Sequence, residues 1–147
     1  MPQNHSRMKL RISKLILPFI LFAFYRQTES WFYEPLGNYY HFSSAKMPEV
    51  HYLIYFWDIA SKFLINTLIS LLCIDLFYGN QFYNKLARYT FLMIGIVVIP
   101  IYFYQVYEAF PFGKMFGYYT RRVLIHPIVL LVLLASFYFD SKKNKYL

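Results

Sequence analysis

The sequence is poor in the residues that build catalytic and metal centres. It has one cysteine, Cys73, which excludes an internal disulfide and a multi-cysteine metal site. Its four histidines are scattered along the chain, so we expect no metal site and no other cofactor. A glycine-rich phosphate loop and an internal repeat are also lacking. We therefore favour a non-catalytic protein, and keep an enzyme as an alternative.

Charge is also scarce. Charged residues make up 15% of the chain, against about 25% in ordinary soluble domains. Hydrophobic residues make up 59%, and there are 16 tyrosines and 16 phenylalanines. The net charge of +8 does not indicate nucleic acid binding, because the basic residues flank apolar runs instead of forming one patch. Their position fits a membrane protein in contact with anionic lipid.

Four apolar runs dominate the 147 residues, at positions 15–25, 59–78, 89–107 and 123–139. A chain of this length has no soluble core large enough to bury them, whereas a bilayer accepts about 20 apolar residues per helix. We therefore expect an all-α polytopic membrane protein, in which residues 1–147 form a single domain with four transmembrane helices in a small bundle. The predicted helices cover about residues 10–25, 58–78, 88–107 and 119–139. Pro100 predicts a kink or a local break in the third.

The segment between the first two helices is unusually aromatic. We expect Trp31, Tyr33 and Pro35 to lie in the membrane interface or over the helix bundle, where they would form an interaction surface. Residues 50–57 are also apolar and predict an interfacial segment or a tilted extension of the second helix.

The distribution of lysine and arginine predicts the orientation of the chain. Basic residues are densest before residue 15, between the second and third helices, and after residue 140. The positive-inside rule then predicts that both termini lie in the cytoplasm and both long loops outside it. The sequence after residue 24 lacks the small residues of a signal peptidase site, so we expect the first helix to be an uncleaved anchor.

Two arginines are the most informative local feature. Arg121 and Arg122 begin the fourth helix on the side that the positive-inside rule leaves poor in charge. Arginine at this depth pairs with an anion, which predicts a site for a partner, a lipid phosphate or a carboxylate. The candidate ion-pair partners within the chain are Glu34, Glu49, Asp58 and Glu108. We favour the simpler interpretation, in which the arginines form an internal salt bridge between the loop after the first helix and the start of the fourth, or contact lipid headgroups.

A second feature lies in the second helix, where Lys62, Asn66, Ser70 and Cys73 follow helical spacing on one face. In lipid, such polar side chains face other helices, so we interpret Asn66, Ser70 and Cys73 as a polar packing face. Lys62 lies four residues after Asp58, which predicts an ion pair along the helix.

Three segments resemble one known family. They are Trp31-Phe-Tyr-Glu-Pro-Leu, Lys62-Phe-Leu-Ile-Asn-Thr-Leu-Ile-Ser and Tyr118-Tyr-Thr-Arg-Arg-Val-Leu-Ile-His-Pro. In order and spacing they resemble the exosortase F-associated proteins, small membrane proteins of Flavobacteria and other Bacteroidetes that are encoded beside an exosortase. The resemblance implies a multi-pass protein of the bacterial inner membrane that assists C-terminal protein sorting. It implies no activity and no role for any single residue.

These observations predict a non-catalytic inner-membrane accessory protein that contacts lipid and either an exosortase or its sorted substrate. Two alternatives stay open. One is a small oligomeric carrier or channel built around the Asn66 and Ser70 face. The other is a membrane enzyme that acts on a lipid or a peptide at the outer interface.

Overall fold

A computed structural model describes residues 20–23, 25, 35–41 and 46–143, and all regular structure in these residues is helical. The helices are α2 (Gly37–His41), α3 (Tyr52–Tyr78), α4 (Gln81–Tyr107), α5 (Lys114–Ile125) and α6 (Ile128–Lys143). The predicted all-α class is therefore confirmed. Residues 20–23 and 25 are helical and belong to the predicted first helix, whose residues 10–19 lie outside the described part.

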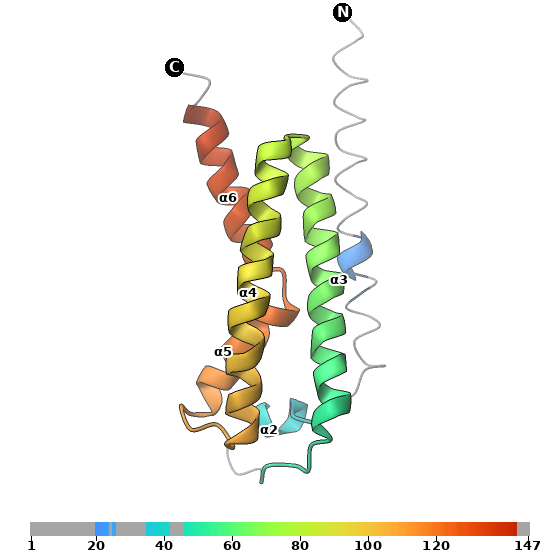
Figure 1. Ribbon diagram of the computed structural model, residues 1–147, viewed down its shortest axis with the longest axis vertical. Coiled ribbons are helices and arrows are strands. Elements are labelled where there is room, and N and C mark those ends of the chain that lie inside the picture. The colour runs from blue at the N-terminus through green and yellow to red at the C-terminus, as the bar shows by residue number, and fades with distance from the viewer. Residues whose placement is uncertain (1–19, 24, 26–34, 42–45, 144–147) are drawn as a thin grey trace, which may run out of the picture.

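Helices α3 and α4 form a long antiparallel hairpin around which the other elements are arranged (Figure 1). The turn between them follows from two residues. Gly79 takes the left-handed conformation, with φ +56°, and its N–H donates to the Asp75 carbonyl at 2.8 Å. The Asn80 side chain then accepts from the Phe82 N–H at 2.9 Å and caps α4.

The two helices approach most closely at Gly95. A Cβ atom there would lie 2.9 Å from Cε1 of the Phe63 ring on α3. Because Gly95 has no side chain, the Phe63 ring can pack directly against the backbone of α4, as happens at small residues where membrane helices pack.

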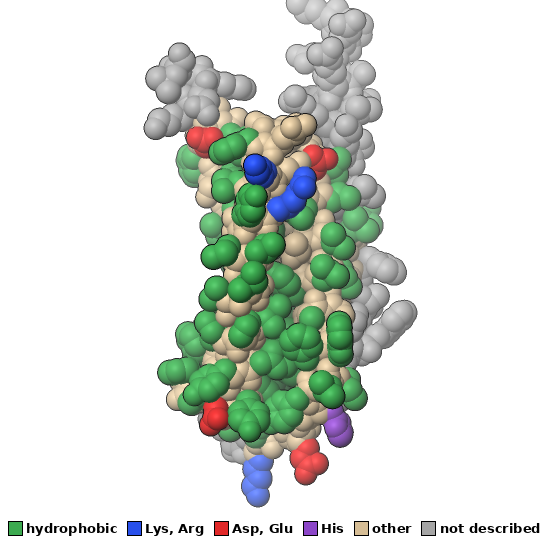
Figure 2. Space-filling view, in the orientation of Figure 1, with side chains coloured by type: hydrophobic (Ala, Val, Ile, Leu, Met, Phe, Trp, Pro, Cys, Tyr) green, Lys and Arg blue, Asp and Glu red, His purple; other side chains and the backbone are tan. Residues whose placement is uncertain are grey.

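Most of the outer surface of the hairpin is apolar. On α4 alone, Leu92, Met93 and Ile96 are each more than half exposed. Figure 2 shows hydrophobic side chains over the middle of the visible face and charged side chains toward the two ends. A patch of this extent exceeds what a soluble monomer exposes. Lipid is the solvent that matches such a surface.

The described residues contain two or three of the four predicted spans. Helices α3 and α4 are each long and apolar enough to cross a membrane, and α5 with α6 adds a third span if the bent pair counts as one. Most of the predicted first helix lies outside the described residues, so the four-span bundle stays a prediction. Both α3 and α4 begin earlier than predicted, at Tyr52 instead of residue 58 and at Gln81 instead of residue 88. The apolar segment before residue 58 is thus a helical extension of α3.

The predicted fourth helix is two helices. The chain bends by 63° between α5 and α6, and the break falls at His126 and Pro127. Helix α6 is held against the hairpin by the Tyr78 hydroxyl, which donates to the Leu134 carbonyl at 2.9 Å. Pro100, by contrast, lies inside α4 without ending it.

Candidate functional site

The site begins with a line of polar side chains buried along α3. Asp58, Lys62, Asn66 and Ser70 recur every four residues and are 8%, 0%, 1% and 0% exposed. A spacing of four residues keeps them on one face of the helix. That face packs against α4 and α5. We call these four residues the polar stripe.

The stripe begins with a buried ion pair. Lys62 Nζ lies 2.9 Å from Asp58 Oδ2, and the two side chains are 0% and 5% exposed. A lone ammonium or carboxylate would be costly inside a membrane protein, and pairing offsets much of that cost. Asp58 is therefore held by Lys62, in agreement with the local pair that the spacing predicts.

The next residue of the stripe meets the helix break. In a continuous helix, residue 127 would donate its N–H to the Val123 carbonyl, but proline has no N–H. Residue 128 would donate to the Leu124 carbonyl, but the Ile128 N–H donates to the His126 carbonyl at 2.8 Å. Asn66 supplies the replacement: its Nδ2 donates to the His126 carbonyl at 3.2 Å and, at the 3.5 Å limit, to the Leu124 carbonyl. One amide on α3 thus stabilises the open backbone between α5 and α6.

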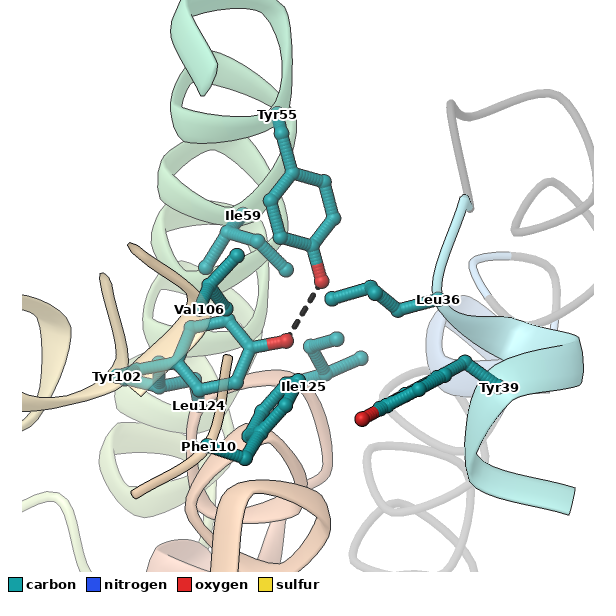
Figure 3. Close-up of a cluster of buried hydrophobic side chains, with 9 residues drawn as sticks. All are labelled: Leu36, Tyr39, Tyr55, Ile59, Tyr102, Val106, Phe110, Leu124 and Ile125. Carbon is teal, nitrogen blue, oxygen red and sulfur yellow. Dashed lines mark hydrogen bonds between the residues drawn. The ribbon is translucent and has the colours of Figure 1, made fainter. Parts of the chain in front are cut away.

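Nearer the start of α3 than the ion pair, three tyrosines from three elements share a hydroxyl network. The Tyr102 hydroxyl lies 2.6 Å from that of Tyr55 and 3.1 Å from that of Tyr40. Figure 3 shows Tyr55 and Tyr102 pointing toward each other inside a cluster of buried hydrophobic side chains. The cluster consists of Leu36, Tyr39, Tyr55, Ile59, Tyr102, Val106, Phe110, Leu124 and Ile125.

Burial raises the pKa of Tyr40 above its ordinary value, with a smaller opposing effect from its hydrogen bond to Tyr102. The hydroxyl of Tyr40 therefore keeps its proton for the network at any physiological pH.

These three tyrosines could not be singled out from the sequence, because nothing in a chain with 16 tyrosines distinguishes the three that meet.

Replacing Tyr102 with phenylalanine should lower the free energy of unfolding by about 1–2 kcal/mol, because it removes one buried partner from two hydroxyl groups at once. Unfolding of the purified full chain by dodecyl sulfate in mixed micelles measures the change. Tyr104→Phe, on the same helix but 54% exposed, is the matched control. Equal stability of the two variants would contradict a structural role for the network.

A further polar contact joins α4 to α5. Gln105, which is 0% exposed, donates through Nε2 to Thr120 Oγ1 at 3.5 Å, and Thr120 in turn donates to the Phe116 carbonyl at 2.7 Å. Sequence reasoning also missed this pair. A single glutamine near a helix end gives no signal of burial.

The structure places Arg121 and Arg122 against aromatic rings. The guanidinium carbon of Arg121 lies 5.8 Å from the centre of the Tyr40 ring, and that of Arg122 lies 4.5 Å from the Tyr118 ring. Lys114 Nζ lies 4.0 Å from the Tyr39 ring. Arginine and lysine over ring faces gain a cation–π attraction. Helix α2 is thus bound to α5 by cationic side chains over tyrosines.

The other predicted site residues lie in different elements of the chain. Glu49 and Glu108 are exposed, and Pro35 is half-buried in the turn before α2. Cys73 is buried beside an apolar cavity that Pro127 also lines. The predicted residues Trp31, Tyr33 and Glu34 lie outside the described part of the chain. Within that part, no three histidine, cysteine or acidic side chains gather in a group that would hold a metal ion.

Comparisons of the chain with protein family models, with curated proteins and with solved structures found no match. The class of protein follows from the described helices: two of them, or three if the bent pair counts as one span, are long and apolar enough to cross a membrane, which is typical of a membrane protein. Its function therefore has to be argued from its own residues.

Proposed function

We propose that the chain is a non-catalytic accessory protein of the inner membrane that binds an exosortase through the outer face of α5. The choice of partner comes from the sequence resemblance, and the choice of surface comes from the structure. Lipid surrounds the remaining apolar face of the protein.

The observation that carries the proposal is the division of α5 into two faces. Its inner face buries Gly117, Thr120 and Leu124 against the hairpin. Its outer face presents a second set of residues, which we call the α5 outer stripe: Met115, Tyr119 and Arg122. These recur at positions i, i+4 and i+7, so they form one line along the helix.

The outer stripe has the composition of a protein-binding surface. Met115 is 69% exposed and Tyr119 is 60% exposed, and methionine, tyrosine and arginine are enriched at interfaces. Tyrosine and arginine are also the residues that most often dominate binding energy. Because Arg122 already lies over the Tyr118 ring, its side chain is partly ordered before binding. Less conformational entropy is then lost when a carboxylate of a partner docks.

Arg122→Ala and Tyr119→Ala should each reduce co-purification of the neighbouring exosortase by at least about tenfold, the effect expected of an interfacial anchor. The experiment uses the tagged full chain in native membranes solubilised in mild detergent. Arg88→Ala is the charge-matched control, since Arg88 is exposed on α4, beside the turn at the other end of the hairpin. Tyr138→Ala, on exposed α6 surface, is the aromatic control.

Two results would refute this function. The first is recovery of the exosortase that is unchanged by both α5 variants. The second is normal processing of sorted substrates in a strain that lacks the protein. If both variants instead alter only the phospholipid that is co-purified, α5 contacts headgroups and not a protein partner.

A small oligomeric carrier is the second candidate, and the polar stripe favours it. Buried charge and a broken helix one helical turn apart are features of membrane transport sites. The two or three candidate spans of the described residues are few for a transport path in one chain, so this function requires several copies. Crosslinking that traps only monomers in intact membranes would dismiss it.

A further inference from the structure

We infer that the break between α5 and α6, together with Asn66 and Ser70 of the polar stripe, forms an intramembrane site for a sodium ion. The inference does not depend on the proposed function, because it rests on backbone and side-chain oxygen atoms in the interior of the chain.

The first argument is the backbone at the break. Val123 has lost its helical donor because residue 127 is proline. Ile125, the last residue of α5, receives no backbone donor among the contacts of the described residues. These carbonyl groups, with that of Leu124, form the C-terminal end of α5, where the helix dipole is negative. An exposed helix C-terminus inside a membrane protein attracts a cation, as the broken helices of sodium-coupled transporters illustrate.

The second argument is independent of the backbone and comes from α3. The Nδ2 group of Asn66 donates its two hydrogens to the Leu124 and His126 carbonyls. This fixes the orientation of its amide, because the flipped orientation would set oxygen against oxygen. Its Oδ1 atom, on the same terminal carbon, therefore lies at the break and has no donor among the described residues.

Ser70, one helical turn further along the stripe, has the same property. Its Oγ atom is buried and has no hydrogen-bond partner within the described part of the chain. An unsatisfied polar atom at this depth costs about 1–3 kcal/mol. Asn66 and Ser70 lie one turn apart on the polar stripe, and a ligand that both oxygen atoms contact would offset this cost.

The available atoms select the class of ligand. Amide, hydroxyl and backbone oxygens are hard neutral ligands, which suit a monovalent cation. A divalent ion would require carboxylates, and the nearest one in the stripe, Asp58, is held by Lys62. The Asp58 and Lys62 pair has no net charge, so it offers little repulsion to a cation one turn away.

Sodium should therefore raise the melting temperature of the purified full chain in detergent. At about ten times its dissociation constant, the expected rise is about 3–6 °C relative to choline chloride at equal ionic strength. The rise should saturate with sodium concentration. Binding of radioactive sodium to the same sample should saturate over the same range.

Ser70→Ala tests the site without removing the amide that stabilises the break. The variant should fold and lose both the sodium-dependent rise and the saturable binding. Ser136→Ala is the matched control, since this serine is exposed on α6 and bonds only to its own helix at Val132, and it should behave as the parent protein does. Asn66→Ala should lose sodium binding as well, and some stability in choline chloride.

Three results would overturn the inference. The first is equal melting temperatures in sodium chloride and choline chloride. The second is a rise with potassium chloride equal to that with sodium chloride, which would show that the effect is not selective for sodium. The third is retention of sodium binding by Ser70→Ala.

Discussion

Replacing Asp58 with alanine is expected to lower the free energy of unfolding by about 3–5 kcal/mol, the cost of removing one member of a buried ion pair. Lys62 cannot turn to solvent easily, because its side chain is 0% exposed and it lies nearly three turns inside α3. Its ammonium group then stays in the interior without the carboxylate that offsets the cost of burying its charge. The change is measured by dodecyl sulfate titration of the purified full chain in mixed micelles.

The double variant Asp58→Leu with Lys62→Leu separates a lost charge partner from a lost contact. Removing both charges should restore most of the stability, since a well-packed apolar pair is often as stable as a buried ion pair. Glu108→Ala is the control for loss of an acid at an exposed position and should change the free energy by less than about 0.5 kcal/mol. A double variant as unstable as Asp58→Ala would show that the pair does not act as a unit.

Gly117→Val is the second substitution with a large expected effect, a loss of about 3 kcal/mol through overpacking. A Cβ atom at Gly117 would collide with Cδ1 and Cε1 of the Phe110 ring, and would lie 3.5 Å from Gln105 Oε1. The ring cannot withdraw easily. Phe110 follows Ala109 in a turn where both have positive φ, at 64° and 53°, and its N–H donates to the Gln105 carbonyl at 2.6 Å.

Combining Gly117→Val with Phe110→Ala identifies the source of that loss. If the clash with the ring is responsible, the double variant should be more stable than the sum of the two single changes by at least about 1 kcal/mol. Met115→Val, on the exposed face of the same helix, controls for the effect of valine in α5. Additive losses in the cycle would show that Gly117 is needed for its backbone alone.

The apolar runs predicted the α3–α4 hairpin well, because lipid leaves a helix as the natural structure for about 20 apolar residues. The beginning of α3 was left between two alternatives. Residues before Asp58 were predicted to be an interfacial segment or a tilted extension of the helix, since the full run exceeds the thickness of a bilayer core. The structure extends α3 to Tyr52, and Tyr55, which is 1% exposed, shows why: packing against α4 rewards the extra helical turns.

The two prolines show where local rules stop. Pro100 was predicted to kink or break its helix, and α4 continues through it without a break. Pro127 was placed inside a single helix that proves to be two. Both remove one N–H. At the Pro127 break the carbonyls of Leu124 and His126 accept hydrogen bonds from Asn66 of α3, and these bonds stabilise the interrupted backbone. A partner sixty residues away in sequence is invisible to propensity or periodicity.

The candidate site was accessible from sequence only in part. Spacing alone put Lys62, Asn66 and Ser70 on one face of a helix, and the structure buries all three. The spacing could not reveal which residues of the other helices these three side chains contact. Tyr102 and Gln105 come from α4 and become important only through folding, because burial converts ordinary side chains into a connected polar network.

The length and charge of α5 have a consequence for biogenesis. Its 12 residues extend about 18 Å at 1.5 Å per residue, less than the roughly 30 Å of the hydrocarbon layer, and they include Lys114, Arg121 and Arg122. Helix α5 is therefore too short and too charged to be released into lipid by itself. We expect it to settle only after the α3–α4 hairpin is in place, when the Asn66 amide is available to bind the backbone at its C-terminal end.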